Sequence, residues 1–272
     1  MELPIAQESY HPSPEALVRA AKRAQIILAR TAAEETTLDT ATLFTNPHRP
    51  ALHALNFAAE LHLIDNDRAQ NLLDTIDAHF QAAQCRCLRL ESSDLPFPPE
   101  LAAAAQTRGY ASHESILYLL QGYNPPHSPL TDLQIIPARA AYPKLQDLFQ
   151  SNAPEEADTD DPAACRQHAQ TRIDFLDDAR LDLFLGRLNA QTAGFVSLLS
   201  LGQIGLIEHV FTLPALRRRG VATRLLDHAI ELCERAQYEQ VILTLPPRSP
   251  AAPLFHRLGF LEVTRYTSYV RP

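Results

Sequence analysis

Residues 217–223, Arg-Arg-Arg-Gly-Val-Ala-Thr, form a basic turn between two regular segments. The apolar run at residues 205–213 predicts a strand before it, and the pattern of residues 223–236 predicts a helix after it. Such a turn directs several backbone N–H groups toward one point at the positive end of the helix. Gly220 permits close approach of a ligand to the backbone, and the arginines add positive charge. This chemistry suits a phosphate or pyrophosphate group.

An ordinary helix start with solvated arginines is the alternative interpretation of this turn, since short basic turns are common. Cations on a first helical turn oppose the helix dipole, however, so this arrangement has a local cost unless an anion lies nearby. The surrounding sequence favours the anion. Net charge is −8, so the arginine cluster stands against an acidic background, which fits one bound anion better than a polyanion track.

A second motif lies about forty residues beyond the turn. Residues 254–260 are Leu-Phe-His-Arg-Leu-Gly-Phe, and the alternating residues 261–270 predict a strand after them. Residues 217–222 have the spacing Arg-x-x-Gly-x-Ala, and Pro214 precedes them by three residues. Together these motifs resemble the signatures of the GNAT superfamily of N-acetyltransferases, whose acetyl-CoA pattern is Gln/Arg-x-x-Gly-x-Gly/Ala.

The resemblance implies an α/β (α+β) GNAT fold, in which helices flank a mixed central sheet. It covers residues 131–272, which predict a strand, two helices, three strands, a helix, a strand, a helix and a strand. The acidic residues 151–161 are predicted to form a loop between the first two of these helices. Its carboxylates either attract a cationic amine or are simply solvated, and both interpretations stay open.

The resemblance also implies acetyl-CoA as the co-substrate, without a metal. The pantetheine arm in family members runs beside the central strand and pairs with its backbone, as an added strand does. The pyrophosphate sits on the amides of the basic turn. The implied cofactor site consists of Val210, Phe211, Thr212, Arg217, Arg218, Arg219, Gly220, Val221, Ala222, Thr223 and Phe255.

Glu208 is the candidate general base, because many family members carry an acid or a histidine at this place. It lies four residues before Thr212 on the same strand face, and strand alternation predicts that His209 points to the other face. An ion-paired or solvated strand residue is the alternative for Glu208. The implied reaction is N-acetylation of a primary amine on a small molecule or peptide, by direct attack in a ternary complex.

The general acid departs from the family pattern. Many members carry a tyrosine five residues before the phenylalanine of Gly-Phe, where this chain has Phe255. Tyr266 is the candidate substitute, with Tyr269 and His256 as alternatives, and a thiolate also leaves unassisted near neutral pH. The absence of the usual tyrosine hydroxyl favours the rival hypothesis of a non-catalytic acyl-CoA binder or scaffold. Transfer to oxygen, or of longer acyl chains, also stays open.

A weak internal repeat suggests a second, degenerate GNAT-like unit in the first half of the chain. Residues 71–90 resemble residues 224–245, and residues 108–119 resemble residues 258–270, at separations of 150 to 155 residues. Residues 64–67, Ile-Asp-Asn-Asp, replace the basic turn and would repel a pyrophosphate. We predict a degenerate domain at 1–122, a proline-rich linker at 123–130 and an acetyl-CoA-binding domain at 131–272; shared helix-strand periodicity is the alternative.

Composition bounds the remaining possibilities. The chain has 272 residues, 46% of them hydrophobic, which suits a globular protein of two ordinary domains. The negative net charge argues against a general nucleic-acid binder, and no apolar stretch predicts a membrane helix or secretory signal. Four cysteines without ligand spacing predict reduced thiols and a cytoplasmic setting. No metal spacing is present, and either a monomer or a homodimer fits.

Overall fold

The computed structural model describes residues 12–63, 69–125, 130, 132–157 and 161–271. Its first half contains α1 (Pro14–Ala29), β1 (Glu34–Leu38), β2 (Ala41–Thr45), β3 (Phe57–Leu61), α2 (Ala69–Ala82), β4 (Arg89–Ser92), α3 (Pro99–Thr107) and β5 (Ala111–Leu120). Its second half contains β6 (Leu133–Pro137), η2 (Ala138–Ala141), α4 (Tyr142–Ala157), α5 (Pro162–Phe175), β7 (Leu181–Leu188), β8 (Gln191–Leu201), β9 (Ile204–Thr212), η3 (Pro214–Leu216), α6 (Val221–Arg235), β10 (Gln240–Leu245), α7 (Ala252–Leu258) and β11 (Phe260–Val270). From α1 and from α5 onward, the two halves have the same order of helices and strands, apart from the short η3.

The two halves also share local details. Helix α1 begins at a Ser13 cap followed by proline, and α5 begins at an Asp161 cap followed by proline. A bulged glutamate lies 47 residues after each cap, at Glu60 and at Glu208. Each glutamate accepts a hydrogen bond from a hydroxyl on the adjacent antiparallel strand, at 2.8 Å for Glu60 and 2.9 Å for Glu208. These matches support the predicted internal repeat.

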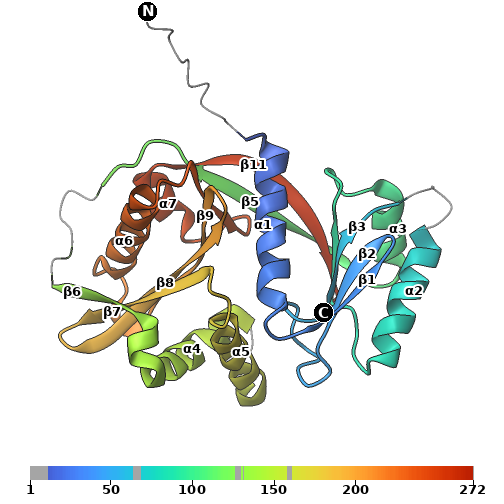
Figure 1. Ribbon diagram of the computed structural model, residues 1–272, viewed down its shortest axis with the longest axis horizontal. Coiled ribbons are helices and arrows are strands. Elements are labelled where there is room, and N and C mark those ends of the chain that lie inside the picture. Colours follow the sequence, from blue (N-terminus) through green and yellow to red (C-terminus); the bar gives the residue numbers. More distant parts are fainter. Residues whose placement is uncertain (1–11, 64–68, 126–129, 131, 158–160, 272) are drawn as a thin grey trace, which may run out of the picture.

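All strands join one mixed sheet in the order β1-β2-β3-β4-β11-β5-β10-β9-β8-β7-β6. Strand β5 of the first half lies between β10 and β11 of the second half, and β11 in turn lies between β4 and β5. The two exchanged strands pair with each other along their whole length and cross the middle of the molecule (Figure 1). The predicted domains therefore share a single sheet, and each half contributes its last strand beside a strand of the other.

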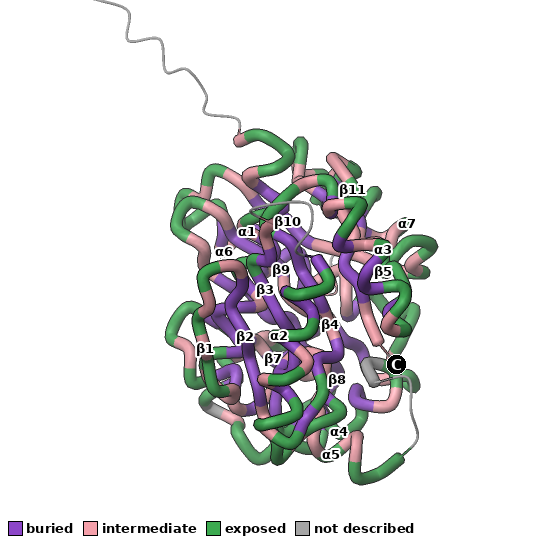
Figure 2. Tube along the Cα trace, turned by 90° about the vertical axis from the view of Figure 1, so that its right-hand side faces the viewer, coloured by how far each residue is buried: buried purple, intermediate pink, exposed green. Residues whose placement is uncertain are grey.

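Helices cover both faces of this sheet, as the GNAT resemblance implies. Helices α1, α4 and α5 pack over one buried cluster that includes Leu28, Phe149 and Phe195. Helices α6 and α7 cover the opposite face around Leu225 and Phe255. The strands between them are largely buried (Figure 2). The turn that follows β9 leads from this buried sheet to the exposed residues 217–220 and then into α6.

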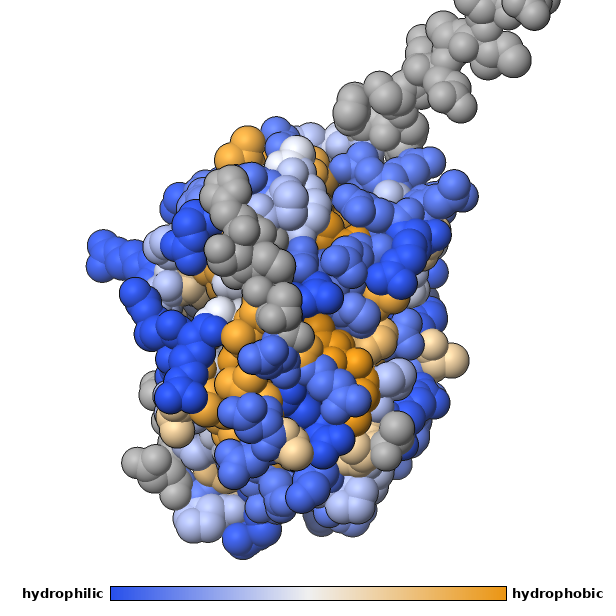
Figure 3. Space-filling view, turned by 90° about the vertical axis from the view of Figure 1, so that its left-hand side faces the viewer, coloured by the Kyte–Doolittle hydropathy of each residue, from blue (hydrophilic) through white to orange (hydrophobic). Residues whose placement is uncertain are grey.

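One face of the second half also exposes apolar side chains. The side that carries β6, β7 and α6 shows an apolar area bordered by hydrophilic residues (Figure 3). Partly buried side chains of the α6 cluster, among them Ile135, Phe184 and Leu188, belong to these elements. No helix of the described residues is both long and apolar enough to cross a membrane. The same residues contain no group of three or more His, Cys, Asp or Glu side chains that could hold a metal ion.

Two predicted segments differ from the structure. Residues 151–157 continue helix α4 through Pro154 instead of forming a loop, because Asn152 and Ala153 are buried against neighbouring elements. The rest of that predicted loop, residues 158–160, lies outside the described residues. The sequence pattern suggests an extended segment at residues 51–64, but only Phe57–Leu61 is a strand, since Leu52 and Leu55 fill the core from hydrogen-bonded turns.

Candidate functional site

The turn after β9 presents an open helix N-terminus. Gly220 is the N-cap of α6 with φ of 85°, and no side chain caps this helix. The backbone N–H groups of Val221, Ala222 and Thr223 lie in the first helical turn, where no intrahelical acceptor exists. Arg218 also has a positive φ of 63°, a strained conformation for a residue with a side chain. The turn therefore offers donors and positive charge to an anion, as the sequence predicts.

The arginines of this turn differ in their contacts. Arg218 and Arg219 are exposed. Arg217 donates through Nε to the carbonyl oxygen of Thr212 at 3.1 Å, and its Nη2 lies 2.5 Å from Glu155 of α4. The predicted acidic segment thus contacts the predicted cofactor turn directly. An anion that binds here would compete with Glu155 for Arg217.

Strands β9 and β10 stop pairing on the way to this turn, and this gap in the strand pairing is called the slot below. The parallel pairing of β9 with β10 ends at the pair Leu206 and Ile242. Beyond that pair β10 continues along β5, while β9 continues along β8 as far as Thr212. The edge of β9 that faces β10 at residues 207–212 has no strand partner in the described chain. An extended ligand can hydrogen-bond to such an edge as an added strand would.

The predicted cofactor residues on β9 lie along this slot. Val210 is partly buried, whereas Phe211 and Thr212 are buried. The Thr212 hydroxyl oxygen is buried and has no hydrogen-bond partner among the described residues. Buried polar atoms are nearly always paired, so this hydroxyl has unused hydrogen-bonding capacity at the end of the slot.

Glu208 lies at a β-bulge in the middle of β9. Ser197 of β8 is opposite His209 and Leu198 is opposite Ile207, so Glu208 is the extra residue. Its carboxylate accepts from Arg172 of α5 at 2.6 Å and from the Ser197 hydroxyl at 2.9 Å. Burial alone would raise the pKa of Glu208, but Arg172, His209 and Ser197 together lower it below its ordinary value. Glu208 is therefore ionised at neutral pH.

His209 joins the same cluster. Its Nδ1 lies 3.3 Å from Arg172 and its Nε2 lies 3.1 Å from the Asn152 amide, while its ring stacks on Phe195 at 5.3 Å. Arg172 therefore contacts both Glu208 and His209, so the prediction that these side chains point to opposite faces is wrong. The bulge interrupts the alternation on which that prediction depends.

Arg172 and Asn152 are site residues that the sequence prediction missed. Arg172 lies near the end of α5, but no local pattern tells which β-strand residue its side chain meets. Asn152 lies in the segment that was predicted to be a loop. Both reach the site only through the packing of α4 and α5 on the sheet.

Replacing Arg172 with methionine is expected to lower the free energy of unfolding by about 3 kcal/mol at neutral pH, because Glu208 stays buried without its cation. The lowered pKa of Glu208 stabilises wild type above pH 4.5, and this contribution is lost as the pH falls through the folded-state pKa. In the Arg172→Met variant, burial instead raises the pKa of Glu208, so the loss of stability relative to wild type becomes smaller as the pH falls.

Urea denaturation of wild type and Arg172→Met at two pH values measures this loss of stability. Arg166→Met, an exposed change on the same helix, is the matched control, and an equal loss in both variants would contradict the role of the ion pair.

The second sequence motif, residues 254–260, lies in the packed core and at the end of α7. Gly259 ends α7 with φ of 101°, and a Cβ there would lie 2.1 Å from the Gly122 carbonyl oxygen. Phe255 is buried, with its ring edge-to-face against Phe260 at 5.8 Å. Phe255 therefore packs in the core under α7.

Tyr266 lies on β11, opposite Ser115 of β5. Its hydroxyl interacts with Ser115 and Thr244, and burial raises the pKa of Tyr266 to about 12. A thiol has an ordinary pKa near 8.5, so proton donation from this tyrosine to a thiolate is unfavourable. His256 and Tyr269 lie apart from each other, beside Tyr118 and Phe97 respectively.

Residues 142–260 match the family model described as Acetyltransferase (GNAT) family. This part of the chain is a GNAT domain. Solved structures of similar shape match both halves of this chain. One is a GCN5-related N-acetyltransferase from Kribbella flavida, with 16% identity, 96% of this chain and 97% of that chain covered, and a TM-score of 0.65. No curated protein matches the chain by sequence.

Two further solved structures are similar along most of the chain. A functionally unknown conserved protein from Staphylococcus epidermidis has 14% identity, with 88% of this chain and 94% of that chain covered, at a TM-score of 0.64. A tandem GNAT protein from the clavulanic acid biosynthesis pathway has 15% identity, with 84% of this chain and 77% of that chain covered, at a TM-score of 0.53. At these identities the likeness concerns the fold alone, and it confirms the predicted fold class.

Proposed function

We propose that the protein transfers an acetyl group from acetyl-CoA to a primary amine of a small molecule or peptide, within a ternary complex. One arrangement carries this proposal: the unpaired edge of β9 leads directly to the uncapped N-terminus of α6. The slot suits an extended pantetheine arm, and the turn suits a pyrophosphate. The family of the second half, GNAT acetyltransferases, agrees with both.

In the proposed reaction, the amine nitrogen attacks the thioester carbonyl carbon. The bulge at Glu208 leaves a backbone N–H outside the regular ladder, and this donor would stabilise the oxyanion of the tetrahedral intermediate. Collapse of the intermediate breaks the carbon–sulfur bond and releases the CoA thiolate. The attacking nitrogen loses one proton, and the thiolate either takes up a proton from water or leaves as the anion.

Glu208 is the proposed acceptor of the amine proton, directly or through a water. Its position at the bulge beside the slot supports this role, although its ion pair with Arg172 makes it a weak base. His209, in the same cluster, is the alternative acceptor that the structure adds. The two roles differ in the pH at which they titrate.

With Glu208 as the base, kcat is expected to be constant from about pH 5.5 to 8. The reason is that the pKa of Glu208 lies below 4.5, so the carboxylate stays ionised over this range. A histidine base would instead give an acidic limb near pH 6.5. Initial rates of CoA release, followed with a thiol reagent across this pH range, make the measurement. A limb near pH 6.5 that disappears in His209→Gln would transfer the role to His209.

A non-catalytic acyl-CoA binder with a GNAT fold is the second candidate. The buried phenyl ring of Phe255 at the usual tyrosine position and the ion-paired state of Glu208 favour it. A panel of primary amines offered with acetyl-CoA separates the two. Amine-dependent CoA release that Glu208→Gln reduces supports the enzyme, whereas tight acetyl-CoA binding without release by any amine supports the binder.

A further inference from the structure

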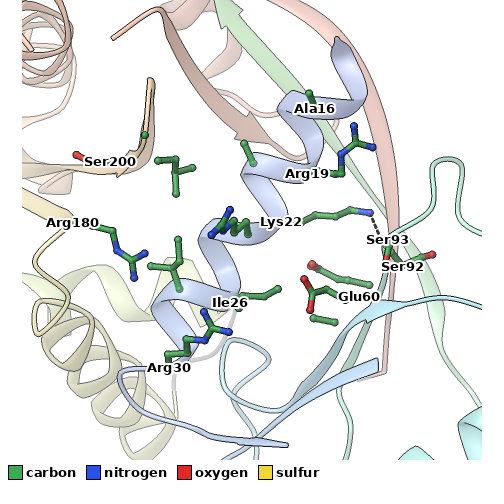
Figure 4. A pocket seen from close by; sticks show the side chains of 17 residues that line it. Ala16, Arg19, Lys22, Ile26, Arg30, Glu60, Ser92, Ser93, Arg180 and Ser200 are labelled. Atoms are coloured by element: carbon green, nitrogen blue, oxygen red, sulfur yellow. Dashed lines mark hydrogen bonds between the residues drawn. The ribbon is translucent and has the colours of Figure 1, made fainter. Parts of the chain in front are cut away.

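A groove runs over the outer face of α1, between the two halves of the molecule. Its cavity volume is about 790 Å³, a size that fits a small organic ligand. The ends of β3 and β4 form one wall, and Arg180 with the β8–β9 turn forms the other (Figure 4). None of the residues that line it belongs to the α6 turn or to the β9 slot. The groove is therefore separate from the proposed acetyl-CoA site.

The helix that forms its floor is strongly cationic. Arg19, Lys22, Arg23 and Arg30 of α1 all line the groove, and Arg180 faces them from the second half (Figure 4). Like charges three and four residues apart on a helix destabilise it slightly. A chain with net charge −8 therefore gathers five cations around one cavity.

Two of these cations are available to a ligand. Arg30 is paired with Glu35 at 2.7 Å, and Arg180 is paired with Asp178 at 2.6 Å. Arg19 and Arg23 are exposed on the groove floor, one turn apart. Neither guanidinium is in a hydrogen bond or close ion pair with a described residue, and Arg19 interacts electrostatically with the exposed Glu15 one turn before it. Two guanidinium groups at this spacing can bind a small anion that has several negatively charged oxygens.

Lys22 of the same helix adds a buried charge to the groove. Only 8% of the residue is exposed, and its Nζ donates to the Ser92 carbonyl oxygen at 2.8 Å. An ammonium group has three donors, and this one also lies 5.5 Å from the centroid of the Tyr266 ring. Burial lowers the pKa of Lys22, while Glu91 and Asp94 oppose the shift. A bound anion would favour the charged lysine further.

Two carboxylates also line the groove, and protein groups contact both. Glu60 accepts from the Thr42 hydroxyl at 2.8 Å. Glu91 is buried and lies 3.2 Å from Arg89, and its second oxygen is inaccessible. Arg30 and Arg180 are already paired with acids outside the lining, so the positive charge that faces a ligand comes from Arg19, Arg23 and Lys22. Ile26, Ala59 and Leu201 supply apolar surface for a carbon skeleton.

From these contacts we infer that the α1 groove binds a small organic molecule with two or more negative charges, such as an organic phosphate or a polycarboxylate. Arg19 and Arg23 hold the charged groups, Lys22 supports them from below, and the aliphatic side chains contact the remainder. The ligand contacts both halves, since the two walls of the groove come from different halves of the chain.

Calorimetric titration with inorganic pyrophosphate, and separately with citrate, tests this site at low ionic strength. All proteins carry Gly220→Asp, which disables the α6 turn, so that only the groove is measured. Arg19→Glu/Arg23→Glu is expected to weaken binding of at least one probe by roughly tenfold or more. Binding to the parent is expected to weaken as salt is added.

Matched variants separate the effect of the groove arginines from the effect of overall charge. Arg86→Glu/Arg166→Glu makes the same charge change at exposed positions outside the groove, and it should bind like the parent. Arg19→Gln/Arg23→Gln removes the two charges without adding new ones, and thermal melts confirm that each variant is folded. Absence of binding of both probes to the Gly220→Asp parent overturns the inference. Equal affinities in the groove variants and the matched control overturn it as well.

Discussion

Gly220→Asp is expected to weaken acetyl-CoA binding at least about a hundredfold while leaving the fold intact. The new carboxylate would stand at the N-terminus of α6, where it repels the pyrophosphate and occupies the same N–H groups. The φ of 85° is unfavourable for a residue with a side chain, by roughly 1–2 kcal/mol. Aspartate is also a good N-cap, and this gain offsets much of that strain. Acetyl-CoA affinity should therefore fall in Gly220→Asp, whereas the free energy of unfolding should change little.

Isothermal titration of acetyl-CoA into wild type and Gly220→Asp measures the affinities, and urea denaturation of the same proteins measures their stabilities. Gly109→Asp is the matched control, because Gly109 has a similar φ of 82° and lies in the first half, where a Cβ would meet nothing within 4 Å. The control should bind acetyl-CoA as wild type does. Unchanged affinity in Gly220→Asp would show that the turn is not the cofactor site.

Residues 131–272 expressed alone are expected to lack a cooperative unfolding transition, although they contain the whole predicted acetyl-CoA-binding domain. This fragment loses β5, which pairs with both β10 and β11. It also loses the α1 side chains Leu17 and Leu28, which are almost fully buried in the core shared with α4 and α5. Burial of each such side chain contributes about 1.5–3 kcal/mol, so these two leucines alone contribute about 3–6 kcal/mol, which is comparable to the net stability of a small domain.

Co-expression with residues 1–130 is expected to restore a soluble complex with a cooperative melt, because both exchanged strands are then present. Near-ultraviolet circular dichroism and thermal melts of the fragment, the complex and the full chain make the comparison. A monomeric fragment 131–272 that melts cooperatively and binds acetyl-CoA would contradict the structural role of β5.

Local patterns predicted many of the individual helices and strands. The apolar run 205–213 was predicted as a strand and is β9 in all but its last residue, and the predicted helix 223–236 is largely α6. Errors occurred where tertiary packing outweighed a local signal. The acidic residues 151–161 suggested a loop, yet the buried Asn152 and Ala153 hold α4 helical through Pro154. β1 carries mostly exposed polar residues and gave no apolar alternation to detect.

One part of the candidate site could likewise be predicted from local sequence, and another part could not. The basic turn is a local feature, so its residues and their approximate geometry could be predicted, including the need for glycine at position 220. The cluster around the bulge could not be predicted, because Arg172 meets Glu208 across 36 residues of chain. The roles proposed for Glu208, Tyr266 and the cofactor residues stay predictions until the variants are measured.

The sequence by itself determined the GNAT resemblance of the second half and the place of the basic turn, and it led to the predictions of an anion site and of an internal repeat. These depend on short motifs and on periodicity within single segments, where backbone preferences act locally. Only the tertiary structure decided the exchange of β5 and β11, the meeting of Arg172 with Glu208 and His209, and the cationic groove over α1. Each of these arises from contacts between residues far apart in the chain, and such contacts leave no pattern in any one segment.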